Sequence, residues 1–110
     1  MGGDAQPQIV LQMLVRMLLD GADPGHVVGG GRWVLTGGDT GFSTWDDPDA
    51  LKVVVEEHAP FNWVPGLNER GHAALVDSVN FGHAHCIEVT DDGLRGAADP
   101  RSLIGEAAGF

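Results

Sequence analysis

The first twenty residues of the chain carry an apolar pattern with the period of an α-helix. Between residues 7 and 19 the only polar side chains are Gln8, Gln12 and Arg16, and they recur at every fourth position, so they form one narrow stripe. Proline is tolerated in the first turn of a helix, and Gly21 provides a C-terminal stop. The pattern predicts a helix that is apolar almost all round. Such a helix is buried inside something larger or is pressed between layers.

The rest of the chain divides into short elements separated by turn residues. A second helix is predicted from an Asp23 N-cap to the glycine run that ends at Gly31. The further predicted elements, in chain order, are a strand over 32–36, a Gly/Asp-rich loop over 37–50, a buried strand over 51–57, a helix capped by Asn62 and ended by Gly71, a strand over 72–78, a strand over 81–90, a hairpin turn over 91–93 and a strand over 94–98. The order helix, helix, strand, strand, helix, strand, strand, strand favours an α+β layered arrangement in a single segment, 1–110.

Composition excludes several classes of function. The chain has 110 residues, 16 acidic and 6 basic side chains and a formal net charge of −10, so no basic cluster is available to neutralise the phosphates of a nucleic acid or to bind a membrane surface. No apolar run approaches the roughly 20 residues that span a bilayer, and the first residues lack the pattern of a signal peptide. The single Cys86 excludes an internal disulfide and a multi-cysteine metal site. Localisation stays open.

Two histidines form a candidate metal site. His83 and His85 lie two residues apart on a predicted strand, so they share a face and together suit Zn²⁺ or Cu²⁺. Cys86 falls on the opposite face, so a third ligand has to come from elsewhere, with His72 nearby in sequence. Packing or hydrogen bonding of the two histidines on a half-covered sheet is the favoured interpretation, and no metal site is assigned. Cys86 is interpreted as a small buried hydrophobic residue and not as a nucleophile.

An acidic cluster in the long loop is a weaker candidate. Asp46, Asp47 and Asp49 suggest a Ca²⁺ loop, but their spacing does not follow the EF-hand pattern and Pro48 interrupts it. A solvated loop is the favoured interpretation.

Several short motifs stand in the order found in one enzyme family. The matching segments are Gly2-Gly3-Asp4, Gln6-Pro7-Gln8, residues 18–24, Gly30-Gly31-Arg32-Trp33, Val54-Val55-Glu56, Glu69-Arg70-Gly71-His72, Phe81-Gly82, Ile87, Asp92-Gly93-Leu94, residues 96–101, Gly105, Ala107, Gly109 and Phe110. On these motifs, which span the whole chain, the sequence resembles the C-terminal part of the small subunit of γ-glutamyltransferases (γ-glutamyltranspeptidases), which are N-terminal-nucleophile hydrolases. It departs from the family where a glycine run replaces the more rigid Ala-Pro before Arg32, and in the length of the loop over 37–50.

The resemblance implies a fold and a chemistry. The fold is part of an α/β/β/α sandwich, and the family transfers γ-glutamyl groups from glutathione-like donors to water, to amino acids or to peptides, without a cofactor. Its nucleophile is an N-terminal Thr that self-cleavage of a precursor sets free. By resemblance, the backbone N–H groups of Gly2 and Gly3 form the oxyanion hole. Members of the family are often periplasmic or extracellular.

The resemblance also predicts that the chain is one part of a longer enzyme. The nucleophile is expected upstream of the Gly2-Gly3 turn, and the threonines of this chain all lie downstream of it: Thr36, Thr40, Thr44 and Thr90. The chain by itself is therefore expected to be inactive and to partner with the rest of the enzyme. When isolated, it is expected to form homo-oligomers because of its apolar helix, by pairing of helices or of sheet edges. The alternative is a free-standing, non-catalytic binding or assembly module. The preference for transfer or hydrolysis, the acceptor and export are left open.

Overall fold

In the computed structural model, the described residues 2–37, 47–77 and 81–109 form three α-helices, two sheets and two short 3-10 turns. In chain order the elements are η1 (Gly3–Ala5), α1 (Gln6–Leu18), α2 (Pro24–Gly29), β1 (Trp33–Thr36), η3 (Pro48–Ala50), β2 (Lys52–Val55), α3 (Trp63–Glu69), β3 (Ala74–Val76), β4 (His85–Thr90) and β5 (Gly93–Ala98). The predicted order of helices and strands is confirmed.

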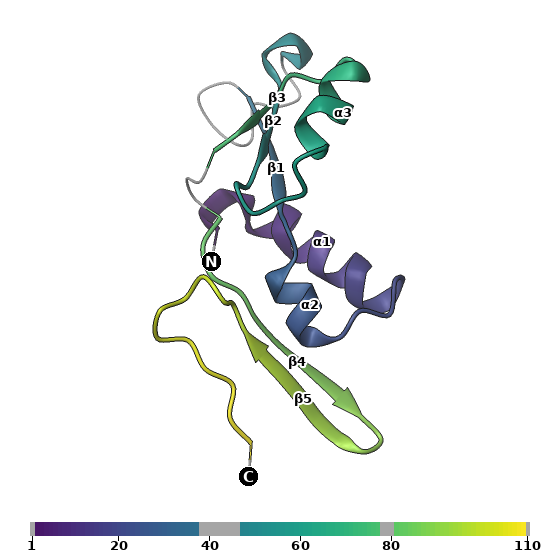
Figure 1. Ribbon diagram of the computed structural model, residues 1–110, viewed down its shortest axis with the longest axis vertical. Helices are drawn as coiled ribbons and strands as arrows, with labels where there is room; N and C mark the ends of the chain where they lie inside the picture. The colour runs from purple at the N-terminus through teal and green to yellow at the C-terminus, as the bar shows by residue number, and fades with distance from the viewer. Residues whose placement is uncertain (1, 38–46, 78–80, 110) are drawn as a thin grey trace.

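The two sheets lie at opposite ends of an elongated molecule that measures 50 × 26 × 25 Å (Figure 1). The first sheet has the order β1-β2-β3, in which β1 and β2 are antiparallel and β2 and β3 are parallel. The second is the β4-β5 hairpin, with His85 opposite Ala98. Helix α3 packs near β3, while α1 and α2 lie between the two sheets, with α1 contacting β1 and α2 contacting the hairpin.

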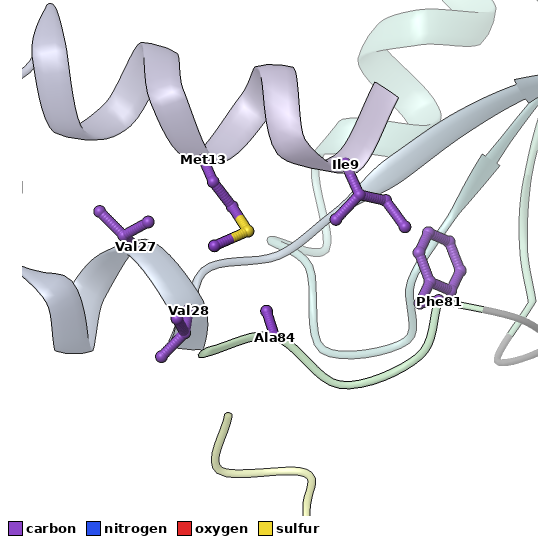
Figure 2. Close-up of a cluster of buried hydrophobic side chains, with 6 residues drawn as sticks. All are labelled: Ile9, Met13, Val27, Val28, Phe81 and Ala84. Carbon is purple, nitrogen blue, oxygen red and sulfur yellow. The ribbon is translucent and has the colours of Figure 1, made fainter. Parts of the chain in front are cut away.

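The core lies where α1, α2 and the segment before β4 meet. Figure 2 shows its six buried side chains, which are Ile9, Met13, Val27, Val28, Phe81 and Ala84. Ile9 from α1 lies beside the Phe81 ring, and Met13 points toward the valines of α2. Burial of a side chain such as Ile9, which is 0% exposed, stabilises the fold by about 1.5–3 kcal/mol. This cluster fixes the N-terminal half of α1 against the rest of the chain.

The opposite face of α1 is exposed. Its exposed large apolar side chains, together with the one that follows the helix, are Leu11, Leu14, Val15, Leu18 and Leu19. Leu18 and Leu19 are 71% and 78% exposed, whereas the buried residues of α1 are Ile9 and Met13. The prediction of a helix is confirmed, but burial within the described residues is one-sided. The apolar face is available for another element to cover.

The polar stripe of α1 covers the outer edge of strand β1. The Gln8 side chain donates from Nε2 to the Leu35 carbonyl (3.0 Å) and accepts the Leu35 N–H (2.7 Å). One turn later, Gln12 donates to the Trp33 carbonyl (2.7 Å) and accepts the Trp33 N–H (3.1 Å). Arg16 continues the series with a hydrogen bond to the Gly31 carbonyl. The side-chain amides thus occupy the hydrogen-bonding positions that a neighbouring strand would fill.

The far strand of the same sheet carries a similar contact. Asn68, on α3, donates to the Ala74 carbonyl (3.2 Å) and accepts the Ala74 N–H (2.8 Å). Ala74 is the first residue of β3, so an amide side chain meets the backbone of both outer strands of this sheet.

Two sequence-based predictions of local structure are wrong. The strand predicted over 81–90 begins only at His85, because Gly82 has a positive φ of 61°, which is incompatible with a strand. Asn62 precedes α3 but makes no side-chain cap, because its own backbone is already helical (φ −84°, ψ −5°) and a capping residue needs an extended conformation. Asp23, whose backbone is extended, does cap α2.

Candidate functional site

The chain enters α1 through two consecutive glycines with left-handed backbone angles. Gly2 has φ 66° and Gly3 has φ 49°, and the Ala5 N–H donates to the Gly2 carbonyl (2.9 Å) to close the turn. A Cβ atom on Gly2 would lie 2.7 Å from Ile9 Cδ1 and 3.5 Å from the Phe81 carbonyl oxygen. The left-handed backbone angles favour glycine at position 2, and any side chain there would also have to displace the tip of Ile9.

A groove of about 690 Å³ opens beside this turn. It is lined by Gly2, Gly3, Asp4, Ala5, Gln8, Val34, Leu35, Thr36, Val54, Asp77 and Gly82. Within the described part of the chain, the N–H groups of Gly2 and Gly3 donate no hydrogen bond to another residue. The groove has the size of a small-molecule site, and two backbone donors stand at its edge.

The titratable groups that line the groove are both carboxylic acids, Asp4 and Asp77. Thr36 brings a hydroxyl to the wall, but no imidazole or amine lines the groove among the described residues. Activation of a hydroxyl as a nucleophile needs an adjacent base. The described groove therefore offers backbone donors for a developing negative charge, without an activated nucleophile.

A buried ionic cluster lies below the turn and is centred on Arg32. Its guanidinium donates to both carboxylate oxygens of Glu56, from Nη2 to Oε1 (2.6 Å) and from Nε to Oε2 (3.1 Å). Nη1 donates to the carbonyls of Phe81 (3.2 Å) and Gly82 (3.1 Å), and the guanidinium lies 5.6 Å from the centre of the Phe81 ring. Because Arg32 is only 2% exposed, these contacts replace its hydration.

Asp99 and Arg101 complete the cluster. Asp99 accepts the N–H groups of Ala84 (2.9 Å) and Arg101 (3.0 Å), and Arg101 donates to Glu56 (2.8 Å) and to the Val28 carbonyl (2.9 Å). Burial acts to raise the pKa of Asp99, but these backbone hydrogen bonds and the Arg101 guanidinium outweigh it, so the pKa lies below its usual range. Two arginines and two carboxylates balance in charge, as a buried ionic cluster requires.

The cluster supports the backbone on which the glycine turn rests. Arg32 holds the Phe81 and Gly82 carbonyls, and a Cβ atom on Gly2 would lie 3.5 Å from the first of these oxygens, so this backbone lies beside the turn. The sequence placed Arg32, Glu56 and Asp99 in separate motifs, and their association was not predicted. One signal was available, since Glu56 directly follows the apolar run 53–55 and is therefore a charged residue at the end of a buried strand.

The other candidate sites gain no support. Among the residues that the structure describes, no group of three His, Cys, Asp or Glu side chains could hold a metal ion. His83 and His85 are both exposed, and His83 precedes the strand, so the two do not share one strand face. Asp47 accepts the Asp49 N–H (3.2 Å) at the start of η3. Asp46 lies outside the described residues.

Cys86 has the environment of a packed thiol. Burial, followed by the negative charge of Glu88, raises its pKa, so the thiolate is disfavoured. The raised pKa agrees with the prediction that Cys86 is not a nucleophile, whereas the predicted burial is only partial, since the side chain is half-buried. Within the described residues, none of the helices has the length and apolar character needed to cross a membrane.

Comparison with known proteins places these features in context. The family described as Gamma-glutamyltranspeptidase matches residues 1–109. The oxamate amidohydrolase proenzyme of Klebsiella pneumoniae is 36% identical over 115 aligned residues, which cover 100% of this chain and 20% of that protein.

Two solved structures share the fold. A gamma-glutamyltranspeptidase T380A mutant from Helicobacter pylori matches with a TM-score of 0.61 and 20% identity, over 87% of this chain and 48% of that one. A gamma-glutamyltranspeptidase from Pseudomonas nitroreducens, complexed with L-DON, matches with a TM-score of 0.64 and 19% identity, over 93% of this chain and 47% of that one. The chain thus spans about a fifth of the length of the Klebsiella relative and about half of the chain in each matched structure.

Proposed function

The chain belongs to the gamma-glutamyltranspeptidase family, and from this premise we propose that it is the C-terminal segment of an enzyme that transfers or hydrolyses the γ-glutamyl groups of glutathione-like donors. We call that longer enzyme the parent. The observation that carries the proposal is the Gly2-Gly3 turn, in which two left-handed glycines stand beside a groove with their N–H groups unused by other described residues. Its proposed role is that of an oxyanion hole.

The chemistry explains why such donors are needed. A hydroxyl nucleophile adds to the γ-carbonyl carbon of the donor, and the π electrons of the carbonyl move onto its oxygen. Two preorganised N–H groups stabilise the resulting oxyanion. When the carbonyl re-forms, the C–N bond breaks and the amine leaves with a proton. Water or an amine acceptor then takes the acyl group from the enzyme by the same two steps.

The proposal divides the active site between this chain and the rest of the parent. Gly2 and Gly3 supply charge stabilisation, and the remainder supplies the nucleophile, its base and the groups that bind the glutamate. The groove described above is consistent with this division, because the described residues that line it offer neither imidazole nor amine. We therefore propose that the isolated chain has no transferase or hydrolase activity, because stabilising an oxyanion is useful only where an acyl group is delivered.

A second candidate substrate comes from the Klebsiella relative. That protein is named an oxamate amidohydrolase proenzyme and is 36% identical, whereas the matched transpeptidase structures are 19–20% identical. Hydrolysis of a small amide acid passes through the same kind of tetrahedral oxyanion, so the role proposed for Gly2 and Gly3 is the same for both substrates. What differs is the part of the substrate bound by the rest of the parent.

Assays of the full-length parent separate these possibilities. We would measure p-nitroaniline released from γ-glutamyl-p-nitroanilide and ammonia released from oxamate. In the Gly3→Pro variant the position 3 N–H is lost and the left-handed φ of 49° becomes inaccessible, because proline fixes φ at about −65°. The variant therefore removes both the donor and the turn that presents it, and kcat is expected to fall by at least about 10²–10³. Gly3→Asn is the matched control, because asparagine tolerates left-handed angles, keeps the N–H, and would place its Cβ where no atom lies within 4 Å. A Gly3→Pro enzyme with unchanged kcat would refute the oxyanion role.

A further inference from the structure

We propose that Gln8 and Gln12 are positioning residues that fix the register of α1 on strand β1 and thereby place the Gly2 and Gly3 N–H groups at the substrate groove. This inference rests on the proposed function. It starts from four hydrogen bonds, two from each glutamine, to the backbone of two residues of one strand.

The spacing of the two elements makes this contact specific. Residues four apart on a helix are about 6.0 Å apart along its axis, and residues two apart on a strand are about 6.6 Å apart. The two spacings are nearly equal, so Gln8 reaches Leu35 and Gln12 reaches Trp33 at the same time. The helix and the strand run in opposite directions. A shift of one residue along either element would turn the amides away from their partners.

Each glutamine contacts its partner at two points. The amide both donates to the carbonyl and accepts the N–H of the same strand residue, as a neighbouring strand would. Contact at two points restrains both the position of α1 along the strand and its rotation about its own axis. The apolar contacts of Ile9 and Met13 are less directional, because hydrophobic burial has no preferred angle.

The register of α1 is transmitted directly to the glycine turn. The 3-10 turn that contains Gly3 runs into α1 without a linker, and Gln8 lies within the first turn of the helix. Gln8 and Leu35 also line the same groove as Gly2 and Gly3. The hydrogen bonds at Gln8 therefore hold the wall of the groove and the two donors in one rigid unit. Misplacement of a catalytic group by 1 Å can lower a rate by about 10²-fold.

The test uses the full-length parent and γ-glutamyl-p-nitroanilide. The double variant Gln8→Met/Gln12→Met keeps side-chain length and removes all four hydrogen bonds. Gln6→Met is the matched control, because Gln6 is exposed on the first turn of the same helix and makes no side-chain hydrogen bond with the described residues. For the double variant we expect kcat to fall about 10- to 100-fold, with KM within about twofold, since the lost interaction acts on the transition state. Gln6→Met is expected to retain the unaltered kcat and KM.

A purely structural role predicts a different result. The thermal midpoint would then fall while kcat per folded enzyme stayed within about twofold of the unaltered value, and this outcome would overturn the inference. If the double variant does not fold, the single variant Gln8→Met provides a milder test, because it keeps side-chain length, adds no charge and removes only the two hydrogen bonds to Leu35. A Gln8→Met enzyme with reduced kcat and unchanged KM supports the inference, and one with unchanged kcat refutes it.

The Gly3→Pro enzyme separates the two proposals. If Gly3→Pro is inactive and the glutamine variants are fully active, only the positioning role fails. If Gly3→Pro is fully active, the oxyanion proposal itself fails, and the positioning role fails with it.

Discussion

Arg32 and Glu56 form a two-point ion pair in the interior of the chain, with Nη2–Oε1 and Nε–Oε2 distances of 2.6 and 3.1 Å. Their side chains are 2% and 6% exposed, so neither charge is hydrated by bulk water. Arg32 immediately precedes β1 and Glu56 immediately follows β2. The pair thereby joins the first sheet to the 81–82 backbone that supports the glycine turn.

Removing one charge of this pair should destabilise the chain strongly. In Glu56→Gln the buried cluster keeps two arginines but only one carboxylate, Asp99, so one guanidinium charge is left uncompensated. The expected loss is about 3–5 kcal/mol in the free energy of unfolding, measured with urea. Glu57→Gln is the matched control, because it removes the same charge from the neighbouring, exposed side chain and should change stability by less than about 0.5 kcal/mol. Equal effects of the two substitutions would show that the buried pair does not stabilise the fold.

Asp99 should make stability depend on pH under acidic conditions. Its pKa is lowered in the folded chain, so its contribution is fully present above the pKa of the unfolded state, about 4, and is lost as pH falls toward the folded pKa. The free energy of unfolding should therefore decrease as pH falls below about 4. The pKa of Asp23 is lowered by its hydrogen bonds with His26, so its protonation adds to the loss of stability over the same acidic pH range.

The test is the slope of unfolding free energy against pH in urea titrations. Asp99→Asn should flatten this slope below about pH 4, because the substituted side chain no longer binds a proton. Asp91→Asn, in the exposed hairpin turn, serves as the control for charge. A slope that Asp99→Asn leaves unchanged would contradict the assignment of acid sensitivity to the ionic cluster.

The exposed face of α1 should drive self-association of the isolated chain. Contiguous apolar surface of this kind is rare on monomeric proteins. Light scattering at high micromolar concentration is expected to give a mass above the monomer, and Leu11→Gln/Leu18→Gln should shift it toward the monomer. Leu103→Gln removes a still more exposed leucine from the C-terminal segment and is expected to have no such effect. A clean monomer of the unaltered chain would count against the expectation.

The sequence predicted the elements better than their contacts. Helix periodicity over residues 7–19 and the Asp91-Asp92-Gly93 turn are local signals, and both predictions hold. The Gln8, Gln12 and Arg16 stripe was visible in the sequence, but its partners lie 15 to 27 residues away, and no local pattern identifies them.

In the candidate site too, local features were predicted from the sequence and contacts between distant residues were not. Gly2 and Gly3 were identified by resemblance, and their left-handed angles suit the role proposed for them, which remains to be tested. The cluster of Arg32, Glu56 and Asp99 joins residues up to 67 positions apart. Such an association depends on tertiary packing, which a single sequence does not encode in its spacing.

The central claim is that this chain provides the oxyanion hole for a nucleophile carried by another part of the parent. The most direct test is reconstitution, in which the purified chain and the separately produced remainder of the parent are assayed alone and mixed, with γ-glutamyl-p-nitroanilide as substrate. Release of p-nitroaniline is expected only from the mixture, and it should be lost when the chain carries Gly3→Pro. Turnover by the 110-residue chain alone would contradict it.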